Sequence, residues 1–336
     1  MSQTTTQLEA PDYMTLEEIT EPVRQHIVDF REFFNDSIRT DVFLLDRIIR
    51  YLHRQKGKEI RPLLVFLSAG LFGTVGRRAY IAATMIELLH TATLIHDDVV
   101  DEADKRRGFL SINKLWRNKA GVLLGDFLLS KGLLVALDNR EYELLHVLSE
   151  AVSKMSEGEL RQLKTSRLLN MTEERYFQII SEKTASLIAA CCKCGAISTS
   201  ADETVHNKMQ EIGLWMGISF QIRDDLFDYG LEDTGKPRRN DIRERKVTLP
   251  LIRALSVASR TEQLAIRTLM RKRRKTGRDI ERIVRFVHDK GGLEASEKIM
   301  KQYARRAIDE LEKLPTDPDS RERFIQLIHF IINRKK

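Results

Sequence analysis

Proline is scarce in this 336-residue chain, and no position from Leu63 to Lys236 holds one. Average usage of about 5% would place roughly nine prolines in a stretch of that length. Because proline breaks the interior of a helix, its absence predicts a long, uninterrupted helical array. The same absence argues against an all-β fold with its many turns.

Cysteine is also rare. The three cysteines, Cys191, Cys192 and Cys194, are close neighbours in the sequence, and neighbours this close do not cross-link a fold. No second cysteine pair or adjacent histidine completes a set of four zinc ligands. We therefore expect the thiols to be packed inside an alanine-rich helix, in a protein of the reducing cytoplasm.

Long apolar runs are missing as well. The longest run without a charged residue, Pro62 to Gly76, has fifteen residues and three glycines, which is too short and too interrupted to span a bilayer. The N-terminus has neither a basic start nor an apolar stretch, so we expect no secretion signal. Residues 1–12 are polar and are predicted to form an unordered tail.

Charge is abundant and slightly unbalanced. The chain has 56 Lys+Arg and 49 Asp+Glu, a formal net charge of +7, and its pI is about 9.2. A basic protein favours an anionic partner, but this balance does not distinguish nucleic acid, a phosphorylated substrate and a membrane surface. Hydrophobic residues make up 42% of the chain, which is enough to build a core.

Apolar residues recur at spacings of three and four for most of the chain, as they do on one face of a helix. No strand-like alternation is evident, and the interruptions between periodic segments are short. Neither a low-complexity linker nor a tandem repeat divides residues 13–336. The sequence therefore predicts one all-α domain of ten or more helices, with apolar faces at 44–52, 81–95 and 123–134.

One short acidic pattern occurs twice. Asp97-Asp98-Val-Val-Asp101 follows one apolar segment, and Asp224-Asp225-Leu-Phe-Asp228 follows another, 127 residues later. At about 100° per residue, the three carboxylates of each cluster occupy an arc of about 100° along one helical turn. Like charges this close repel one another unless solvent or a cation surrounds them. Hard divalent ions such as Mg²⁺ prefer oxygen ligands and complete their shell with water and substrate phosphates.

An acidic surface is the simpler explanation for either cluster alone. Two clusters with the same spacing, each at the end of an apolar helix, favour a metal site, because acidic runs otherwise belong on polar faces. The charge reverses nearby, at Arg106-Arg107-Gly108 and in the segment Lys56-Gly-Lys-Glu-Ile-Arg-Pro62. Carboxylates combined with Arg and Lys are complementary to a metal-bound polyphosphate.

These segments resemble the trans-prenyl diphosphate synthases. The resemblance extends from about residue 40 to the C-terminus. It implies an all-α bundle around a deep central cavity, usually in a homodimer, that condenses isopentenyl diphosphate with an allylic diphosphate. The ordered motifs that carry it are Met85–Asp101, Arg106–Gly108, Val122–Leu128, Glu182–Ala185, Phe220–Asp228, Gly235–Pro237 and Lys246–Pro250.

The resemblance also implies a role for each matching residue. Mg²⁺, expected as three ions on the allylic diphosphate, would be held by Asp97, Asp98, Asp101, Asp224, Asp225 and Asp228. The same diphosphate would be contacted by Arg106, Lys183, Lys236 and Lys246. Isopentenyl diphosphate would be contacted by Lys58, Arg61, His90 and Arg107. Thr184 and Gln221 would line the reacting carbons.

These residue types suit the ionisation of an allylic diphosphate. Charge develops on the departing diphosphate, and preorganised cations lower the barrier. The allylic cation must meet an alkene rather than water, which requires a closed apolar cavity. The sequence departs from the family pattern at Lys56, where glycine is common, and at Arg239 and Arg245, where small residues are frequent.

Product length depends on the floor of that cavity. The allylic tail is expected to run from the first cluster along its own helix, so side chains one turn or more before Asp97 would close the tunnel. Ala92 and Thr93 occupy those positions, where family members with short products often carry aromatic residues. Small residues there predict a medium-to-long product of the heptaprenyl or octaprenyl kind used for quinone tails, unless another helix supplies a bulky floor.

Other functions account for less of the sequence. A farnesyl or geranylgeranyl diphosphate synthase would need a bulkier floor, and a terpene cyclase usually replaces the second cluster. A catalytically dead regulatory subunit typically loses both clusters. A non-catalytic basic helical protein that binds nucleic acid leaves both unexplained, so we expect no nucleic-acid partner. The basic end, Arg334-Lys-Lys336, is a candidate cap for the active-site mouth or a contact to membrane phosphates.

Overall fold

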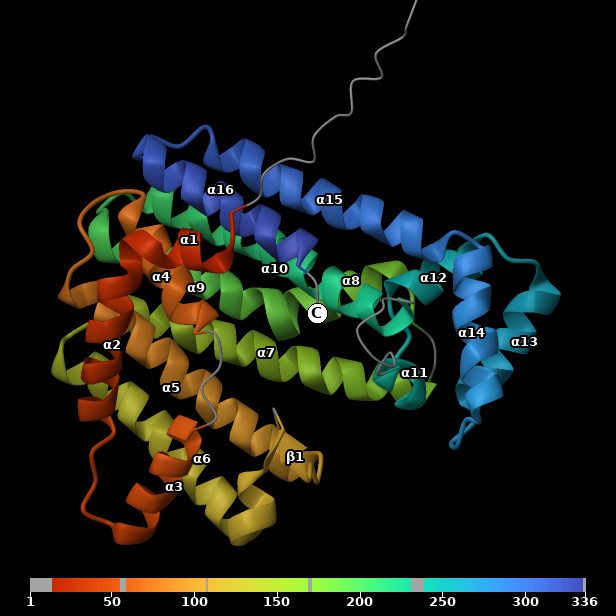
Figure 1. The fold of residues 1–336 in the computed structure, drawn as a ribbon, viewed down its shortest axis with the longest axis horizontal. Helices are drawn as coiled ribbons and strands as arrows, with labels where there is room; N and C mark the ends of the chain where they lie inside the picture. The colour runs from red at the N-terminus through yellow and green to blue at the C-terminus, as the bar shows by residue number, and fades with distance from the viewer. Residues whose placement is uncertain (1–13, 55–58, 107, 169–170, 231–238, 335–336) are drawn as a thin grey trace, which may run out of the picture.

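A computed structural model describes residues 14–54, 59–106, 108–168, 171–230 and 239–334. Nearly all regular structure in these residues is helical, which confirms the predicted fold class (Figure 1). The helices are α1 (Leu16–Thr20), α2 (Arg24–Ser37), α3 (Phe43–Arg54), α4 (Ile60–Gly70), α5 (Arg77–Val100), α6 (Ile112–Asp138), α7 (Tyr142–Leu168), α8 (Glu173–Ile180), α9 (Ser186–Thr199), α10 (Glu203–Tyr229), α11 (Asn240–Arg243), α12 (Leu249–Ser256), α13 (Arg260–Arg271), α14 (Gly277–Asp289), α15 (Gly292–Leu311) and α16 (Pro318–Asn333).

Two short helical segments and one strand pair complete the regular structure. A 3₁₀ turn, Glu21–Val23, joins α1 to α2, and a π-helical segment, Ser181–Ala185, joins α8 to α9. The strands β1 (Lys105–Arg106) and β2 (Phe109–Leu110) pair antiparallel directly after the first aspartate cluster. The sequence shows no strand-like alternation at these residues. Two residues per strand are too few to leave a visible alternation in the sequence.

Several helices begin at side chains that cap their free backbone N–H groups. Thr172, Asp202 and Asp317 each accept an N–H from the first turn of α8, α10 and α16. Ser259 and Thr276 form complete capping boxes at the starts of α13 and α14. Such caps typically contribute about 1 kcal/mol each. These caps fix where the helices begin, and the short breaks before them lie largely where the apolar spacing of the sequence is interrupted.

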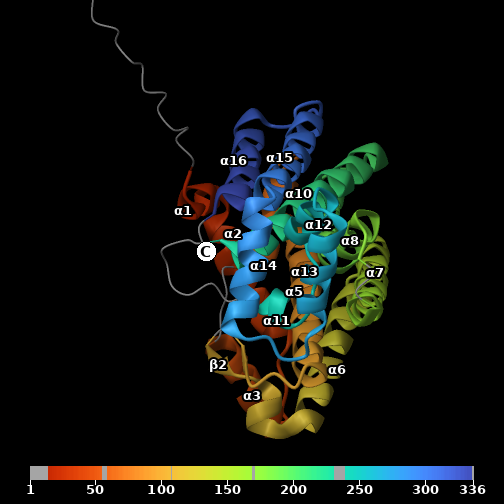
Figure 2. The same ribbon diagram turned by 90° about the vertical axis from the view of Figure 1, so that its right-hand side faces the viewer.

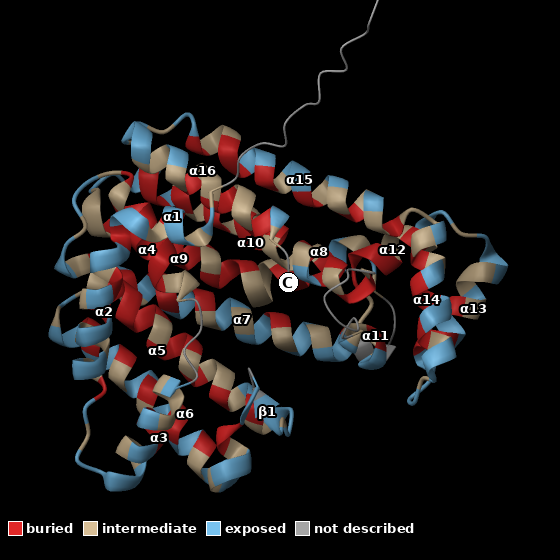
Figure 3. Ribbon diagram, in the orientation of Figure 1, coloured by how far each residue is buried: buried red, intermediate tan, exposed pale blue. Residues whose placement is uncertain are grey.

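The core is built around α10, which packs against α9 and α15, while α5 packs against α4, α6 and α9. Buried residues line the facing sides of these helices (Figure 3). α10 can approach its neighbours closely because it has glycine at the contacts. A Cβ at Gly213 would lie 2.7 Å from Ala189 Cα, and a Cβ at Gly217 would lie 2.6 Å from Ala185 Cα.

The three cysteines are free and fully buried on α9, as predicted. Burial raises the pKa of Cys192 and that of Cys194 to about 12. Thiols with such high pKa values are weak nucleophiles and poor metal ligands at neutral pH. They serve as small apolar side chains in the contact between α9 and its neighbours.

α6 differs from the other long helices because much of its apolar surface is exposed. Leu124 and Leu128 are buried against the core, but Leu123, Leu133 and Leu134 are exposed, so the face predicted at 123–134 is only partly a core face. By length and composition α6 could cross a membrane, although 39% of its most apolar 18-residue stretch is buried in the protein. It is also interrupted at Arg117, which has φ 70° and ψ 163°.

Candidate active site

The first aspartate cluster lies at the C-terminal end of α5. Asp97 is exposed, whereas Asp98 is only 4% exposed. Asp101 follows the last helical residue, keeps helical backbone angles and donates its N–H to the Asp97 carbonyl, 2.8 Å away. The Asp98 carbonyl accepts the N–H of Ala103, so the chain turns away at once toward β1. The three residues therefore share one turn, as the spacing predicted.

The second cluster lies in the last two turns of α10. Asp224 is exposed, whereas Asp225 and Asp228 are buried. In Figure 1 α5 and α10 both run from the left of the molecule toward its middle, where α5 ends at β1 and α10 ends beside α11. Figure 2, turned so that the right-hand side of Figure 1 faces the viewer, shows α11 and β2 on the side toward which both helices run. The two clusters are thus brought to the same end of the bundle from positions far apart in the sequence.

Asp225 lines a cavity of about 110 Å³ that also contains Lys183, Thr184, Gln221 and Lys246. The Tyr176 hydroxyl donates to Asp225 Oδ2 over 2.6 Å, and Gln221 Nε2 donates to Oδ1 over 2.9 Å. Thr184 in turn donates its hydroxyl to Gln221 Oε1 over 2.9 Å. Burial raises the pKa of Asp225 to about 8, although these hydrogen bonds oppose the rise.

The π-helical segment carries Lys183 and Thr184 into this cavity. Two glycines from neighbouring helices allow it to fit. A Cβ at Gly158 of α7 would lie 2.8 Å from the Lys183 backbone nitrogen, and Gly217 of α10 contacts Ala185. π-bulges of this kind often occur at functional sites because they re-aim side chains.

Both lysines of the cavity are paired with acidic side chains. Lys183 forms an ion pair with Glu159 of α7, and Lys246 Nζ lies 2.7 Å from a carboxylate oxygen of Glu244. Lys246 also lies 3.9 Å from Asp241, whose pKa is raised to about 6 by burial. The sequence analysis did not identify Asp241. The only hint in the sequence is that this acidic residue precedes Lys246 by five positions.

Asp228 is engaged by the backbone. Its Oδ2 accepts the N–H of Asp241 over 2.7 Å, so its carboxylate holds the start of α11 in place. Arg239 and Arg245, which flank α11, both have left-handed backbone angles, with φ of 49° and 64°. Glycine adopts these angles without strain, which gives a physical reason for small residues at these positions.

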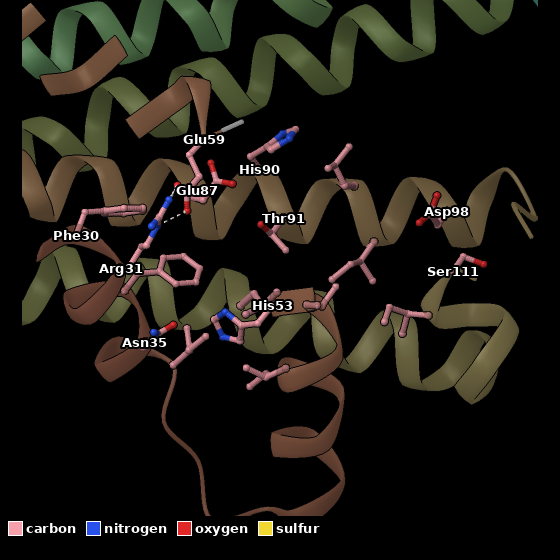
Figure 4. Close-up of a pocket in the computed structure, with 18 residues that line it drawn as sticks. Phe30, Arg31, Asn35, His53, Glu59, Glu87, His90, Thr91, Asp98 and Ser111 are labelled. Atoms are coloured by element: carbon pink, nitrogen blue, oxygen red, sulfur yellow. Dashed lines mark hydrogen bonds and ion pairs between the residues drawn. The ribbon is translucent and has the colours of Figure 1, made fainter. Parts of the chain in front are cut away.

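Asp98 lines a second cavity, of about 140 Å³, between α2, α3, α5 and α6 (Figure 4). Its walls are mostly apolar, and on α5 they include Thr91, Leu94 and Ile95. At the end away from Asp98, Arg31 forms an ion pair with Glu59 over 2.6 Å (Figure 4). The cavity therefore runs along α5 from the first cluster toward α2.

The two residues expected at the tunnel floor lie beside this cavity rather than in its wall. Ala92 is buried, and Thr93 is half-buried with its hydroxyl bonded to the His90 carbonyl. His90 lines the cavity and is 7% exposed, and Arg61 is half-buried at the start of α4. Lys56, Lys58, Arg107, Lys236 and the side chain of Arg106 lie outside the described residues.

Arg334, near the C-terminus, lies on the second cluster. Its guanidinium forms an ion pair with Asp224 and stacks on Phe220, 3.9 Å from the ring centroid. Arg223 donates to the Arg334 carbonyl over 2.8 Å and so anchors the end of the chain. Arg334 therefore covers part of the carboxylate cluster that was expected to hold metal.

The carboxylates suit a hard divalent cation that shares its ligands with a bound anion. In the part of the chain that the structure describes, no three Asp, Glu, His or Cys side chains form a ready-made cation site. Mg²⁺ usually needs only one or two carboxylates and takes its remaining ligands from substrate phosphates and water. Burial raises the pKa of Asp225, at the end of α10, and that of Asp241, on α11, and a cation bound beside them would favour their ionised forms.

Comparison with known proteins identifies the class. Residues 42–287 match the family model for polyprenyl synthetases, and the chain belongs to that family. As a member of the polyprenyl diphosphate synthase family, it is a prenyltransferase. The octaprenyl diphosphate synthase of Escherichia coli (strain K12) is 34% identical over 326 residues, which cover 96% of this chain and 100% of that protein.

Solved structures agree with this class. A decaprenyl diphosphate synthase from Rhodobacter capsulatus has a TM-score of 0.89 and 31% identity, covering 95% of this chain and 99% of that one. A polyprenyl synthase from Caulobacter crescentus CB15, complexed with calcium and isoprenyl diphosphate, has a TM-score of 0.87 and 30% identity, covering 97% and 100%. Among the sequence relatives, a geranylgeranyl diphosphate synthase from Saccharolobus solfataricus (strain ATCC 35092 / DSM 1617 / JCM 11322 / P2) is 32% identical over 319 residues, which cover 92% of this chain and 95% of that protein. Family membership alone therefore does not determine product length.

Proposed function

We propose that this protein condenses isopentenyl diphosphate with an allylic diphosphate in a Mg²⁺-dependent reaction and makes an all-trans product in the heptaprenyl to octaprenyl range. The observation that carries the proposal is the position of the two aspartate clusters at one end of the bundle, beside cavities lined by basic and apolar side chains. Quinone side chains are the expected use of such a product. Its synthesis is expected in the cytoplasm.

In this proposal, three Mg²⁺ ions are held by Asp97, Asp98, Asp101, Asp224, Asp225 and Asp228. Bound Mg²⁺ supplies charge stabilisation for the departing diphosphate. Lys183 and Lys246 turn from their acidic partners toward the same diphosphate and neutralise its charge. The apolar walls beside Asp98 exclude water from the allylic cation. Thr184 and Gln221 hold the reacting carbons, while Arg61 and His90 contact isopentenyl diphosphate.

We place the growing prenyl chain along α5, starting at Asp98. Thr91, the cavity-lining residue two turns before the first cluster, is small and leaves room for isoprene units at that level. The cavity beside Asp98 extends past Thr91 to the level of Glu87, three turns before the first cluster. A farnesyl or geranylgeranyl product would instead require a bulky side chain within the first turn or two.

We also propose a homodimer that forms through α6. Its exposed apolar side chains would otherwise face water, and a second copy of the same helix provides a matching apolar surface. The members of this surface are Leu115, Val122, Leu123, Leu129, Leu133, Leu134 and Leu137. Leu123→Glu together with Leu134→Glu should convert the dimer into a monomer in light scattering after size exclusion. An unchanged mass would contradict this interface.

Three further expectations stay proposals. The first is that residues 13–336 act as one domain. The described residues form two clusters of buried apolar side chains, and Leu293 of α15 packs against both, which supports this proposal. The basic end caps the active-site mouth through Arg334. Peripheral contact with a membrane would help to release the apolar product, and vesicle co-sedimentation of the full chain with and without residues 334–336 tests this contact.

Product analysis is the experiment that tests the function. The protein is incubated with Mg²⁺, farnesyl diphosphate and excess isopentenyl diphosphate, and the dephosphorylated prenyl alcohols are sized by mass spectrometry. One dominant product, heptaprenyl or octaprenyl alcohol, is expected. Cyclic hydrocarbon with free diphosphate would favour a cyclase. No turnover from folded protein with any allylic primer would mean that this site does not work alone.

A further inference from the structure

Tyr176 is a buried residue of the active site that none of the recognised motifs contains. It lies on α8, is 3% exposed and packs its ring edge-on against Phe177, with 5.4 Å between the ring centroids. Its phenol donates its O–H to Asp225 Oδ2 over 2.6 Å.

The other oxygen of Asp225 is held from a different direction. Gln221 lies one turn earlier on α10 and donates its side-chain amide to Oδ1. The orientation of this amide is set by Thr184, whose hydroxyl donates to Gln221 Oε1. One donor from α8 and one from α10 thus fix the plane of the carboxylate.

Such a pair of donors leaves the carboxylate able to bind a cation. Each carboxylate oxygen can accept about two hydrogen bonds or ligand contacts, and each oxygen of Asp225 has one described hydrogen bond. Partners of this kind orient a metal ligand, and their loss typically weakens metal binding about 10- to 100-fold. A rotating carboxylate would have to lose this freedom each time a cation binds.

We propose that Tyr176 is a positioning residue, whose hydroxyl orients the Asp225 carboxylate toward the metal-bound diphosphate. This inference rests on the proposed function, because it assumes that Asp225 holds a cation. It assigns Tyr176 no contact with substrate. Its effect passes entirely through Asp225.

The test removes only the hydroxyl. Tyr176→Phe keeps the ring, and Mn²⁺ binding is measured by EPR titration in the presence of inorganic pyrophosphate. We expect the apparent Mn²⁺ dissociation constant to rise about 10-fold or more. In turnover assays, raising Mg²⁺ should recover most of the lost kcat, which a general packing defect would not allow.

Tyr80→Phe is the matched control. Tyr80 also donates its hydroxyl to an aspartate, Asp29, over 3.3 Å, but near the start of α5 and far along that helix from Asp97. This variant should bind Mn²⁺ as the wild type does. Tyr176→Met, which fills the ring volume without a hydroxyl, repeats the test if Tyr176→Phe folds poorly, and it should weaken binding to a similar degree.

A double variant separates positioning from packing. If Tyr176 acts through Asp225, then Tyr176→Phe should weaken Mn²⁺ binding no further in an Asp225→Asn background. Wild-type affinity in both Tyr176 variants would overturn the positioning role while leaving the proposed function intact. A wild-type protein that binds no Mn²⁺ with pyrophosphate would overturn the metal role of the cluster, and the inference about Tyr176 with it.

Discussion

Asp225→Asn should stabilise the metal-free protein at neutral and alkaline pH while abolishing turnover. The carboxyl is 3% exposed, and burial raises its pKa to about 8 from a usual value of 3.8. Asparagine has nearly the same shape and does not ionise. The variant therefore removes the cost of burying a charge and, with it, the charge that a cation would need.

The pH dependence follows from the direction of this pKa change. The unfolded chain loses the Asp225 proton near pH 3.8 and the folded chain near pH 8, so the folded state holds the proton more tightly between these values. The stabilising contribution is fully present below pH 3.8 and is lost as the pH rises to 8. The loss is at most about 1.4 kcal/mol per pH unit.

The hydrogen bonds around Asp225 can adapt to asparagine. Its carbonyl can accept from Tyr176, and its amide can donate to Gln221 once the Gln221 side chain turns over. Thr184 can then accept the Gln221 amide, because a hydroxyl both donates and accepts. The rearranged network should cost about 1 kcal/mol. The variant removes the larger cost of ionising a buried carboxyl. We therefore expect the free energy of unfolding of Asp225→Asn to exceed that of the wild type by about 2–4 kcal/mol at pH 8 and by less than about 1 kcal/mol at pH 5.

Urea unfolding in EDTA from pH 5 to pH 8.5 measures this difference. The free energy of unfolding of Asp225→Asn, relative to wild type, should rise with pH. Asp289→Asn, at an exposed aspartate at the end of α14, serves as the control and should give no such slope. Parallel stability curves for Asp225→Asn and the wild type would refute the account of a buried, uncompensated carboxyl.

The remaining predictions concern Arg334 at the active-site mouth, the proposed tunnel along α5 and the backbone around α11. Arg334→Ala frees Asp224 from its ion pair, so the Mg²⁺ concentration for half-maximal activity should fall severalfold, and an unchanged Mg²⁺ titration would exclude competition at this carboxylate. Ala92→Phe should shorten the product in mass spectrometry, and an unchanged length would exclude this position as the floor. Arg245→Gly should raise the free energy of unfolding by about 0.5–1 kcal/mol because φ is 64° there. The control Arg243→Gly, inside α11, should lower it by a similar amount.

The fold class and the position of each aspartate cluster at a helix end were predictable from the sequence because both depend on local patterns. Apolar spacing predicts helices wherever one face must be buried. The repeated aspartate spacing marked the ends of α5 and α10 before either helix was seen. Burial of the three cysteines followed from their alanine-rich surroundings. None of these conclusions needs knowledge of which helices touch.

The two-residue strands and the exposed face of α6 were not predicted, because local sequence patterns do not reveal them. A two-residue strand leaves no periodic signal, and an apolar stripe looks the same whether it meets the core, a second subunit or a membrane. Residues 123–134 carry such a stripe, and only packing against α5 shows that Leu124 and Leu128 lie inside while Leu123 lies outside. Periodicity shows that a face is apolar but does not identify its partner.

Which carboxylates stand together on one helical turn follows from the sequence alone, because the helix sets the distance between them. The burial of Asp225, the exposure of Asp224 and its ion pair with Arg334 depend on the tertiary packing. It alone placed Tyr176 of α8 and Asp241 beside Asp225. The physical reason is that burial and pKa depend on groups from other helices, and their approach is governed by small contacts such as Gly217 against Ala185.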